Sequence, residues 1–346
     1  MIHIDGSLGG GQMLRSAVTL SALTGKGVKI TNIRKGKKDA KPGLRPQHIT
    51  VIDVIGSFCN AEILGLKENS LEVEFRPWQI TARDRKIDVG TAGSVSLLIQ
   101  ALLPVLLFSG KEVRLQIKGG TDVAWSPTIN YMKFVFLPML RKMGMNTELE
   151  IARHGFYPKG GGEVKLTTYP VKKIKPLKAT ERGDFIGMHI EALVGRYPKE
   201  YAERMAKAAL GVFEYSLPKE KASIGLKVVD TEDYGASLLC FATYKNSILG
   251  LDALSERGIE PEKFGIKVAE DFASLLATDA VIDKFLSDQI LIYMALADGL
   301  SEIKVESITE HCLTNMHVIE KMLPVNFKID KQSKIISVEG ANFSRE

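Results

Sequence analysis

The stretch SVSLLIQALLPVLLFSGKEVRLQIKGGTD, residues 94–122, contains the pattern that decides the fold. Apolar residues fill most of 94–108, which predicts a buried helix, and Gly110 follows as a typical helix terminator. Polar and apolar side chains then alternate over 113–117, as they do in a strand with one buried face. Further along we expect a loop, a second helix and two strands, at 119–122, 128–143, 147–152 and 162–168.

The same order of elements occurs once before this stretch and once after it. Before it we expect a helix at 12–23, a strand at 28–33, a basic loop at 34–45, a helix at 46–58 and strands at 61–64 and 71–75. After it we expect a helix at 288–297, a strand at 303–308, a loop that carries His311, a helix at 315–323 and strands at 326–329 and 334–338. Each unit is β-α-β-α-β-β. Because each exposes an apolar sheet face, the units should pack side by side with their equivalent loops at one end.

The spacing of the glycines that end helices locates an insertion. Gly25 and Gly110 are 85 residues apart, whereas Gly110 and Gly299 are 189 apart, an excess of 104. The extra residues have the pattern of a small α/β domain, with strands expected at 186–194, 222–229 and 237–244 and helices at 200–215 and 262–277. The predicted fold is therefore α/β (α+β), with a large three-repeat domain at 1–180 and 279–346 and an inserted domain at 181–278.

Composition excludes several classes of protein. The chain has 346 residues, of which 45% are apolar and 25% charged, enough for a large core. Its longest apolar run, 97–108, is interrupted by Gln100 and Pro104 and is shorter than the ~18 residues of a membrane span. The N-terminus lacks the pattern of a signal peptide. The cysteines, Cys59, Cys240 and Cys312, lie far apart, which argues against a disulfide framework or a zinc site. We expect a cytoplasmic protein with no membrane contact, and the sequence leaves its oligomeric state, a homo-oligomer included, open.

Positive charge is concentrated in one segment. The net charge is +5, and residues 34–45 contain six cations among glycine and proline. Such a loop would attract polyanions, either nucleic acid or the phosphates of a nucleotide. A second basic run at 172–178 has no glycines, and we expect it to be a solvated linker.

Two glycine-rich segments precede predicted helices. In GGGQMLR, residues 9–15, the glycines would let backbone N–H groups approach a phosphate, although a plain turn is an equal alternative. Arg15 favours the phosphate because a guanidinium binds two of its oxygens at once. GTAGS, residues 90–94, repeats the arrangement, and Gln100 follows about two turns later. As a polar group in an apolar helix, Gln100 needs a backbone or ligand partner.

His311 lies between a predicted strand and a predicted helix. Free N–H groups at the start of a helix favour a phosphate, so an imidazole there is placed to attack phosphorus. The alternative is a packed or capped surface histidine. His317 is six residues further on, which is not a same-face spacing, and a histidine metal site is not expected.

Asp288 and Gln289 begin the predicted first helix of the third unit, at the place equivalent to Gly11 and Gln12 in the first. A carboxylate there could simply interact with the helix dipole. It could also hold Mg²⁺ that bridges nucleotide phosphates. The sequence alone leaves both interpretations open.

Taken together, these segments resemble the RNA 3'-terminal phosphate cyclases. The similar motifs are GGGQMLR (9–15), AKPGL (40–44) with Gln47 and His48, TAGS (91–94) with Gln100, GGTD (119–122), RHGFYPKGGG (153–162), ERG (181–183), LSDQ (286–289) and HCLTN (311–315). They cover nearly the whole chain in order, and RHGFYPKGGG is the most specific.

The resemblance implies a fold of three repeats like the C-terminal domain of translation initiation factor 3, with a small inserted domain. It also implies a reaction in which ATP adenylylates a histidine and AMP passes to an RNA 3'-phosphate. The neighbouring 2'-hydroxyl then displaces AMP and leaves a 2',3'-cyclic phosphate. By position, His311 matches the nucleophile.

The resemblance assigns the other roles by position too. The nucleotide would be bound by Gln12, Arg15, Gln100, Phe285, Leu286, Ser287, Asp288 and Gln289, with Asp288 also a ligand of Mg²⁺ or Mn²⁺. The RNA phosphate would be bound by Arg34, Lys41, Arg45, Gln47 and His48.

Three departures from the family pattern stand out. Residues 5–12 are two residues shorter than usual and lack a glutamate, Phe285 replaces a common tyrosine, and the arginine expected beside Gln47 is shifted to Arg45. The missing glutamate leaves one alternative, a catalytically impaired, RNA-binding scaffold in ribosome biogenesis, although such proteins lack the histidine that is present here. An enolpyruvyl transferase, built from related repeats, would need a substrate-binding pattern that the sequence does not show.

Overall fold

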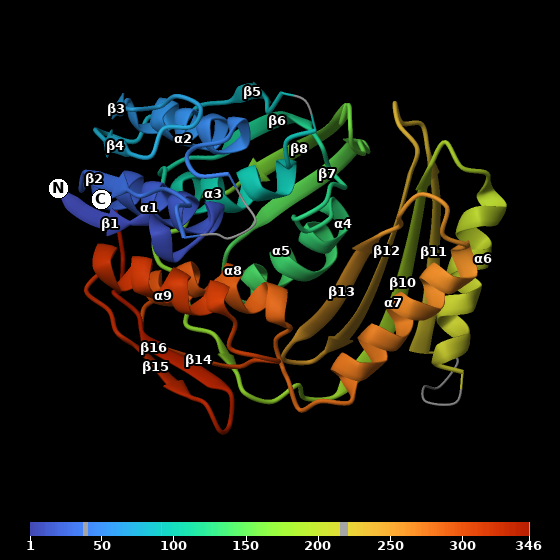
Figure 1. Ribbon diagram of the computed structural model, residues 1–346. Coiled ribbons are helices and arrows are strands. Elements are labelled where there is room, and N and C mark those ends of the chain that lie inside the picture. Colours follow the sequence, from blue (N-terminus) through green and yellow to red (C-terminus); the bar gives the residue numbers. More distant parts are fainter. Residues whose placement is uncertain (37–40, 91, 215–220, 346) are drawn as a thin grey trace.

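The computed structural model describes residues 1–36, 41–90, 92–214 and 221–345, and within them the strands form four four-stranded sheets (Figure 1). Three of the sheets share one topology. Their orders are β1-β2-β4-β3, β5-β6-β8-β7 and β9-β14-β16-β15. In each, the first two strands are parallel and the last two run antiparallel. The three β-α-β-α-β-β repeats expected from the sequence are confirmed.

The first repeat consists of β1 (Ile2–Asp5), the short helix η1 (Gly6–Leu8), α1 (Gly11–Thr24), β2 (Val28–Thr31), α2 (Pro46–Cys59), β3 (Glu62–Leu64) and β4 (Val73–Arg76). Helix α1 ends where Gly25 takes the left-handed conformation, with φ 71°. This confirms the glycine as the terminator. Residues 37–40 of the basic loop, between β2 and α2, lie outside the described residues.

The second repeat consists of β5 (Arg85–Asp88), α3 (Val95–Leu107), β6 (Val113–Gly119), α4 (Ile129–Tyr131), η2 (Met132–Phe136), α5 (Leu137–Lys142), β7 (Thr147–Arg153) and β8 (Gly162–Thr168). The single helix expected at 128–143 is interrupted by η2, a π-helical turn. Pro138 has no N–H to donate to the carbonyl of Phe134, and its ring would crowd that carbonyl. The helix widens there, and the N–H of Leu137 bonds to Met132 O instead.

The third repeat consists of β9 (Lys178–Ala179), α8 (Lys284–Leu296), β14 (Leu300–Lys304), α9 (Glu310–Met322), β15 (Phe327–Asp330) and β16 (Ile335–Glu339). The basic run at 172–178, expected to be a linker, ends inside β9, which pairs in parallel with β14. That part of the prediction was wrong, because both apolar residues of the run, Ile174 and Leu177, are buried in the core.

Both helices of the third repeat begin earlier than expected. Asp283 caps α8 by accepting the N–H groups of Phe285 and Leu286, so Asp288 lies in the second turn rather than at the start. The Thr309 side chain caps α9, so His311 lies in its first turn rather than in a loop. In both places the sequence has a side chain that can accept N–H bonds, which overrides the weaker apolar pattern of these turns.

The insertion lies between β9 and α8 and forms the fourth sheet, β11-β10-β12-β13. Its elements are β10 (Phe185–Gly195), α6 (Lys199–Val212), β11 (Ala222–Val229), β12 (Gly235–Tyr244), β13 (Ile248–Leu254) and α7 (Pro261–Leu276). Strand β13 was missed, because Gly250 and Asp252 obscure its alternation. This α/β unit has an apolar core of its own, distinct from the core shared by the three repeats. The exact domain borders at 180 and 278 stay a prediction.

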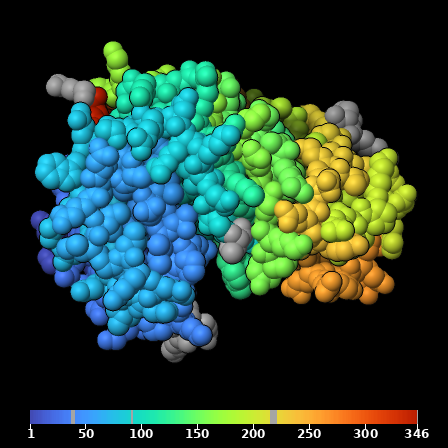
Figure 2. Space-filling view, turned by 90° about the horizontal axis from the view of Figure 1, so that it is seen from above, coloured from blue at the N-terminus to red at the C-terminus, as the bar shows by residue number. Residues whose placement is uncertain are grey.

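Helices of different repeats pack against one another at the centre of the molecule. Figure 1 shows α1, α8 and α9 between the sheet of the first repeat and that of the third, with the inserted sheet and α6 and α7 to one side. In the view from above, the surface is notched between the blue residues of the first repeat and the green residues beyond them (Figure 2). No helix within the described residues is both long and apolar enough to cross a membrane.

Candidate active site

The N-terminal parts of α1, α8 and α9 meet, with contacts between their second turns. On the buried side, Ser16 of α1 donates a hydrogen bond to Asn315 Oδ1 of α9 at 2.6 Å. The amide of Asn315 in turn donates to the backbone carbonyl of Asp288 in α8 at 2.7 Å. One asparagine therefore fixes three helices from two repeats. Because helix N-termini carry free N–H groups and a partial positive charge, their convergence favours a bound anion.

Arg15 and Asp288 form the charged pair of this junction. Burial lowers the pKa of the Arg15 guanidinium to about 10, although the nearby charge of Asp288 opposes the shift. Burial also raises the pKa of the Asp288 carboxyl to about 7, against a hydrogen bond from Gln12 and the charge of Arg15. Asp288 is therefore poised to change charge near neutrality, whereas Arg15 remains a cation. The structure thus brings together three of the residues expected to bind the nucleotide.

The N-terminus of α1 has no side-chain cap within the described residues. Its N-cap residue is Gly10, and no acidic residue lies in its first turn. A Cβ at Gly11 would lie 2.5 Å from Nε2 of His48 and 3.3 Å from a guanidinium nitrogen of Arg15. Only glycine leaves room there for both side chains to approach the helix end.

His48 is a neutral hydrogen-bond donor beside α1. It is 5% exposed. Burial, together with the charges of Arg15, Arg34 and Arg45, lowers the pKa of its imidazole to about 3. Nδ1 accepts the backbone N–H of Arg45 at 3.1 Å, so the one proton of the neutral ring lies on Nε2. That proton faces Gly11 and Arg15.

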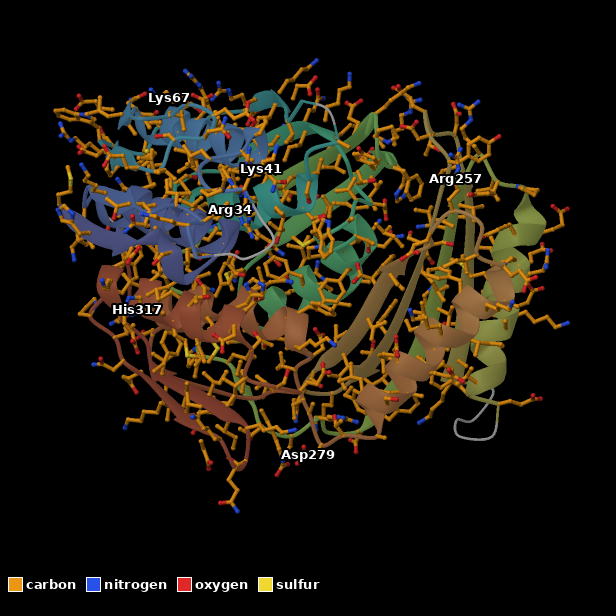
Figure 3. All side chains as sticks on the ribbon, in the orientation of Figure 1. Arg34, Lys41, Lys67, Arg257, Asp279 and His317 are labelled. Carbon is orange, nitrogen blue, oxygen red and sulfur yellow. The ribbon has the colours of Figure 1, made fainter. Side chains whose placement is uncertain are left out.

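The basic loop surrounds His48 with arginines. The Arg34 backbone is held at φ 58° and bonds to Gly6 O at 3.1 Å. Arg45 donates to Asn69 Oδ1 at 2.8 Å. Figure 3 shows Arg34 and Lys41 on the side of the first repeat that faces the centre of the molecule. Lys41 and Gln47 are both exposed. The structure therefore groups Arg34, Arg45 and His48 around the start of α1, while Lys41 and Gln47 extend into solvent.

His311 is an exposed residue in the first turn of α9. The hydroxyl of Thr309 accepts the N–H of Cys312 at 3.1 Å and fixes this turn. Cys312 is buried with its sulfur 3.2 Å from the hydroxyl of Ser287 in α8. Asn315, one turn after His311 on the same face, contacts α1 and α8 as described above. His317 lies further along α9, toward the outside (Figure 3).

The remaining nucleotide-binding candidates lie in the first two turns of α3 and α8. The Gln100 amide contacts Met132 Sδ of the π turn at 3.6 Å. Phe285 is 43% exposed, and the ammonium of Lys284 lies 5.2 Å from its ring centroid. Phe285 lines a cleft of about 850 Å³ between α8 and the inserted unit. Leu286 and Ser287 are buried, and the buried Oε1 of Gln289 has no hydrogen-bond partner among the described residues.

Sequence reasoning missed two buried contacts next to these residues. In the first, Asp122 lies 3.0 Å from His154 Nδ1 and accepts the hydroxyl of Ser237 from the inserted sheet at 3.3 Å. In the second, Tyr131 donates to Asp283 at 2.8 Å. The contact between Asp122 and His154 could have been suspected from the motif RHGFYPKGGG, which contains His154. The contact between Tyr131 and Asp283 joins residues far apart in the chain, and no local pattern indicates it.

The described residues include no group of three or more histidine, cysteine, aspartate or glutamate side chains that could hold a metal ion. Asp288, the expected ligand, is instead engaged by Gln12 and Arg15. That Asp288 is a ligand of a metal ion stays a prediction.

Comparison with known proteins supports the resemblance. The family model described as RNA 3'-terminal phosphate cyclase matches residues 7–329. An RNA 3'-terminal phosphate cyclase of Ignicoccus hospitalis is 40% identical over 94% of this chain and 93% of its own length. Those of Pyrobaculum aerophilum and Pyrococcus furiosus are 38% and 39% identical, over 99% and 95% of both chains. A full-length match of this kind, on a structure of three repeats, shows that the chain belongs to the RNA 3'-terminal phosphate cyclase family of enzymes.

Proposed function

We propose that this protein uses ATP to convert an RNA 3'-terminal phosphate to a 2',3'-cyclic phosphate. A histidine nitrogen of His311 attacks the α-phosphorus of ATP, and pyrophosphate leaves. The RNA 3'-phosphate then displaces the histidine and forms an RNA-adenylate. Finally the adjacent 2'-hydroxyl attacks the activated phosphorus, loses its proton and expels AMP. Family membership and the position of His311 support this sequence of steps.

The observation that carries the proposal is the junction of α1, α8 and α9. His311 projects from the first turn of α9, one turn before Asn315, which is bonded to both other helices. An α-phosphate at this junction would meet the free N–H groups of α1 and the charge of Arg15. Such fixed donors stabilise the negative charge that develops as the histidine attacks. Covalent transfer through an imidazole divides one difficult step into easier ones.

The arginines around His48 suit the RNA 3'-phosphate. Arg34 and Arg45 supply charge, and the Nε2–H of neutral His48 supplies a directed hydrogen bond. Lys41 of the basic loop and Gln47 in the first turn of α2 are exposed and would contact the phosphate only from its outer side. Because His48 adjoins Arg15 and Gly11, a phosphate bound here would lie next to the start of α1, where the AMP would be transferred. Holding both reactants in one place converts a bimolecular step into an intramolecular one.

The nucleotide would lie along the first turns of α8. Phe285 offers an exposed ring for the adenine, while Gln12, Gln100 and the 286–289 segment would surround the remainder of the nucleotide. A Mg²⁺ or Mn²⁺ ion would have to arrive bound to the phosphates of ATP and would supply charge neutralisation there. The Asp288 carboxylate, already engaged by Arg15, would be its candidate protein ligand.

The reaction can be tested with two RNA oligonucleotides that end in a 3'-phosphate, one of which carries a 2'-deoxy sugar at the last position. With ATP, we expect the first to become resistant to phosphatase as its end is cyclised. The 2'-deoxy RNA should stop at the RNA-adenylate, because it lacks the attacking hydroxyl. If neither RNA reacts, the proposal is wrong.

The alternative of a catalytically impaired scaffold predicts RNA binding with no reaction in the same assay. The relatives reported above do not favour it, because all three are named as cyclases.

A further inference from the structure

Trp125 is the most exposed large apolar side chain in the described part of the chain, at 99%. Exposure of a single apolar residue needs no special explanation. The backbone of Trp125, however, also has a φ of 66°. This left-handed conformation is an outlier for a bulky side chain and persists only where the surrounding structure imposes it. A residue that is both strained and fully exposed is a candidate for function.

The loop that presents Trp125 is held at both ends. Next to the tryptophan, Ser126 donates its hydroxyl hydrogen to Val123 O at 2.9 Å. On the C-terminal side, the N–H of Thr128 donates to Asp252 Oδ2 at 2.6 Å. On the N-terminal side, Asp122 is buried against His154. The indole is therefore presented on a loop fixed by two carboxylates, one of them buried, rather than on a loose segment.

These anchors place the loop beside the proposed nucleotide site. Tyr131 of α4 donates to Asp283, and the same carboxylate oxygen accepts the N–H of Phe285. Asp252 and Phe285 line the same cleft of about 850 Å³. Trp125 is three residues from Thr128, which limits the distance between their Cα atoms to about 11 Å. The loop of the tryptophan is therefore tied, through Thr128 and Asp252, to the wall of this cleft.

Besides Phe285, the cleft is lined by three lysines, Lys263, Lys267 and Lys284, and by four carboxylates, those of Asp252, Glu256, Asp271 and Glu306, so its charge alone does not select RNA. In the proposed function, however, the 3' end of the RNA has to reach the nucleotide bound beside Phe285. Proteins bind single-stranded RNA by combining cations along the backbone with aromatic rings on which bases stack. We propose that Trp125 is a stacking platform for a base near the 3' end of the RNA substrate. The identity of this ligand as RNA rests on the proposed function, in which Phe285 serves the adenine of ATP.

The chain offers a matched control in Trp78, its second and last tryptophan. Trp78 is 72% exposed, and its backbone N–H donates to Cys59 O at the C-terminal end of α2, the end opposite His48. Trp78→Phe leaves Trp125 as the only indole, and Trp125→Phe leaves Trp78. Each variant can be titrated with a single-stranded RNA ending in a 3'-phosphate while its tryptophan fluorescence is followed.

We expect saturable quenching of Trp125 by the RNA and none of Trp78. ATP alone should leave the emission of Trp125 unchanged. An RNA that lacks bases in its last three nucleotides should quench Trp125 much less. Quenching of Trp125 by ATP as strong as that by RNA would overturn the proposal, because the ring would then serve the nucleotide. Equal quenching of both tryptophans would also overturn it.

Activity measurements give a second, independent test. Trp125→Leu should raise the RNA concentration needed for half-maximal cyclisation by about 5- to 100-fold, the usual effect of losing one stacked base. It should not change the rate at which the protein itself is adenylylated. Trp125→Phe should recover part of the loss, and Trp78→Leu should have no effect. If the wild type cyclises RNA and Trp125→Leu cyclises it equally well, the stacking platform alone is overturned. If the wild type cyclises no RNA, the proposed function is overturned.

Discussion

Burial keeps the ring of His48 neutral, and this has a measurable effect on stability. The pKa is lowered from 6.5 to about 3 in the folded chain. Between these values the unfolded chain binds one proton more than the folded chain. The free energy of unfolding should therefore fall as the pH drops below 6.5, by about 1.4 kcal/mol per pH unit from this group.

His48→Gln keeps a hydrogen-bond donor but cannot titrate. Denaturant unfolding of both proteins at pH 7, 6 and 5 should show the wild type losing stability faster than the variant. Parallel losses would show that His48 is not held neutral. In the variant, the affinity for an RNA 3'-phosphate should fall less than in His48→Ala, because the amide can replace the Nε2–H.

At the residue scale, the sequence identified most members of the site but not their partners. His311, Arg15 and Asp288 were named from motifs and from the family resemblance. The charge interaction between Arg15 and Asp288 joins opposite ends of the chain, and Asn315 was quoted only as part of a motif. Such contacts depend on how the repeats pack, which local patterns do not encode.

At the scale of elements, the first turn of α9 depends on its cap. Thr309→Ala removes the hydroxyl that accepts the N–H of Cys312. We expect a loss of about 1 kcal/mol in the free energy of unfolding. Because His311 lies in the turn that the cap fixes, the rate of protein adenylylation should also fall.

Thr309→Ser is the matched control, since it retains the hydroxyl and should keep both properties near the wild-type values. Denaturant unfolding and single-turnover adenylylation measure the two effects. A Thr309→Ala protein with unchanged stability and rate would mean that the cap does not position His311.

Element types were predicted more reliably than element boundaries. The three repeats followed from apolar periodicity and from glycines such as Gly25, whose left-handed conformation ends α1. The starts of α8 and α9 were placed too late because Asp283 and Thr309 were not recognised as caps. The π turn before Pro138 could have been suspected from the proline, whereas strand β13 gave too weak an alternation.

At the scale of the whole molecule, the second repeat is joined to the third by the buried bond from Tyr131 to Asp283. Tyr131→Phe deletes only the hydroxyl and leaves a buried carboxylate with one donor fewer. We expect the free energy of unfolding to fall by about 1–3 kcal/mol. Tyr169→Phe removes a similar bond to Glu148 at an exposed position and should change stability much less.

Equilibrium unfolding of the two variants provides the comparison. Equal losses would mean that the contact between the repeats contributes no more than a surface bond. A selective loss in Tyr131→Phe would identify this bond as part of what holds the two repeats, and with them α8, in place.

The central claim is that three repeats bring the first turn of α9 to a phosphate site, where His311 becomes adenylylated. The most direct measurement is incubation of the protein with ATP labelled at the α-phosphate, followed by detection of acid-labile label on the chain. Wild type and His317→Ala, altered two turns away on α9, should both carry the label, and His311→Ala should carry none. Label that persists in His311→Ala, or disappears equally in His317→Ala, would contradict the account.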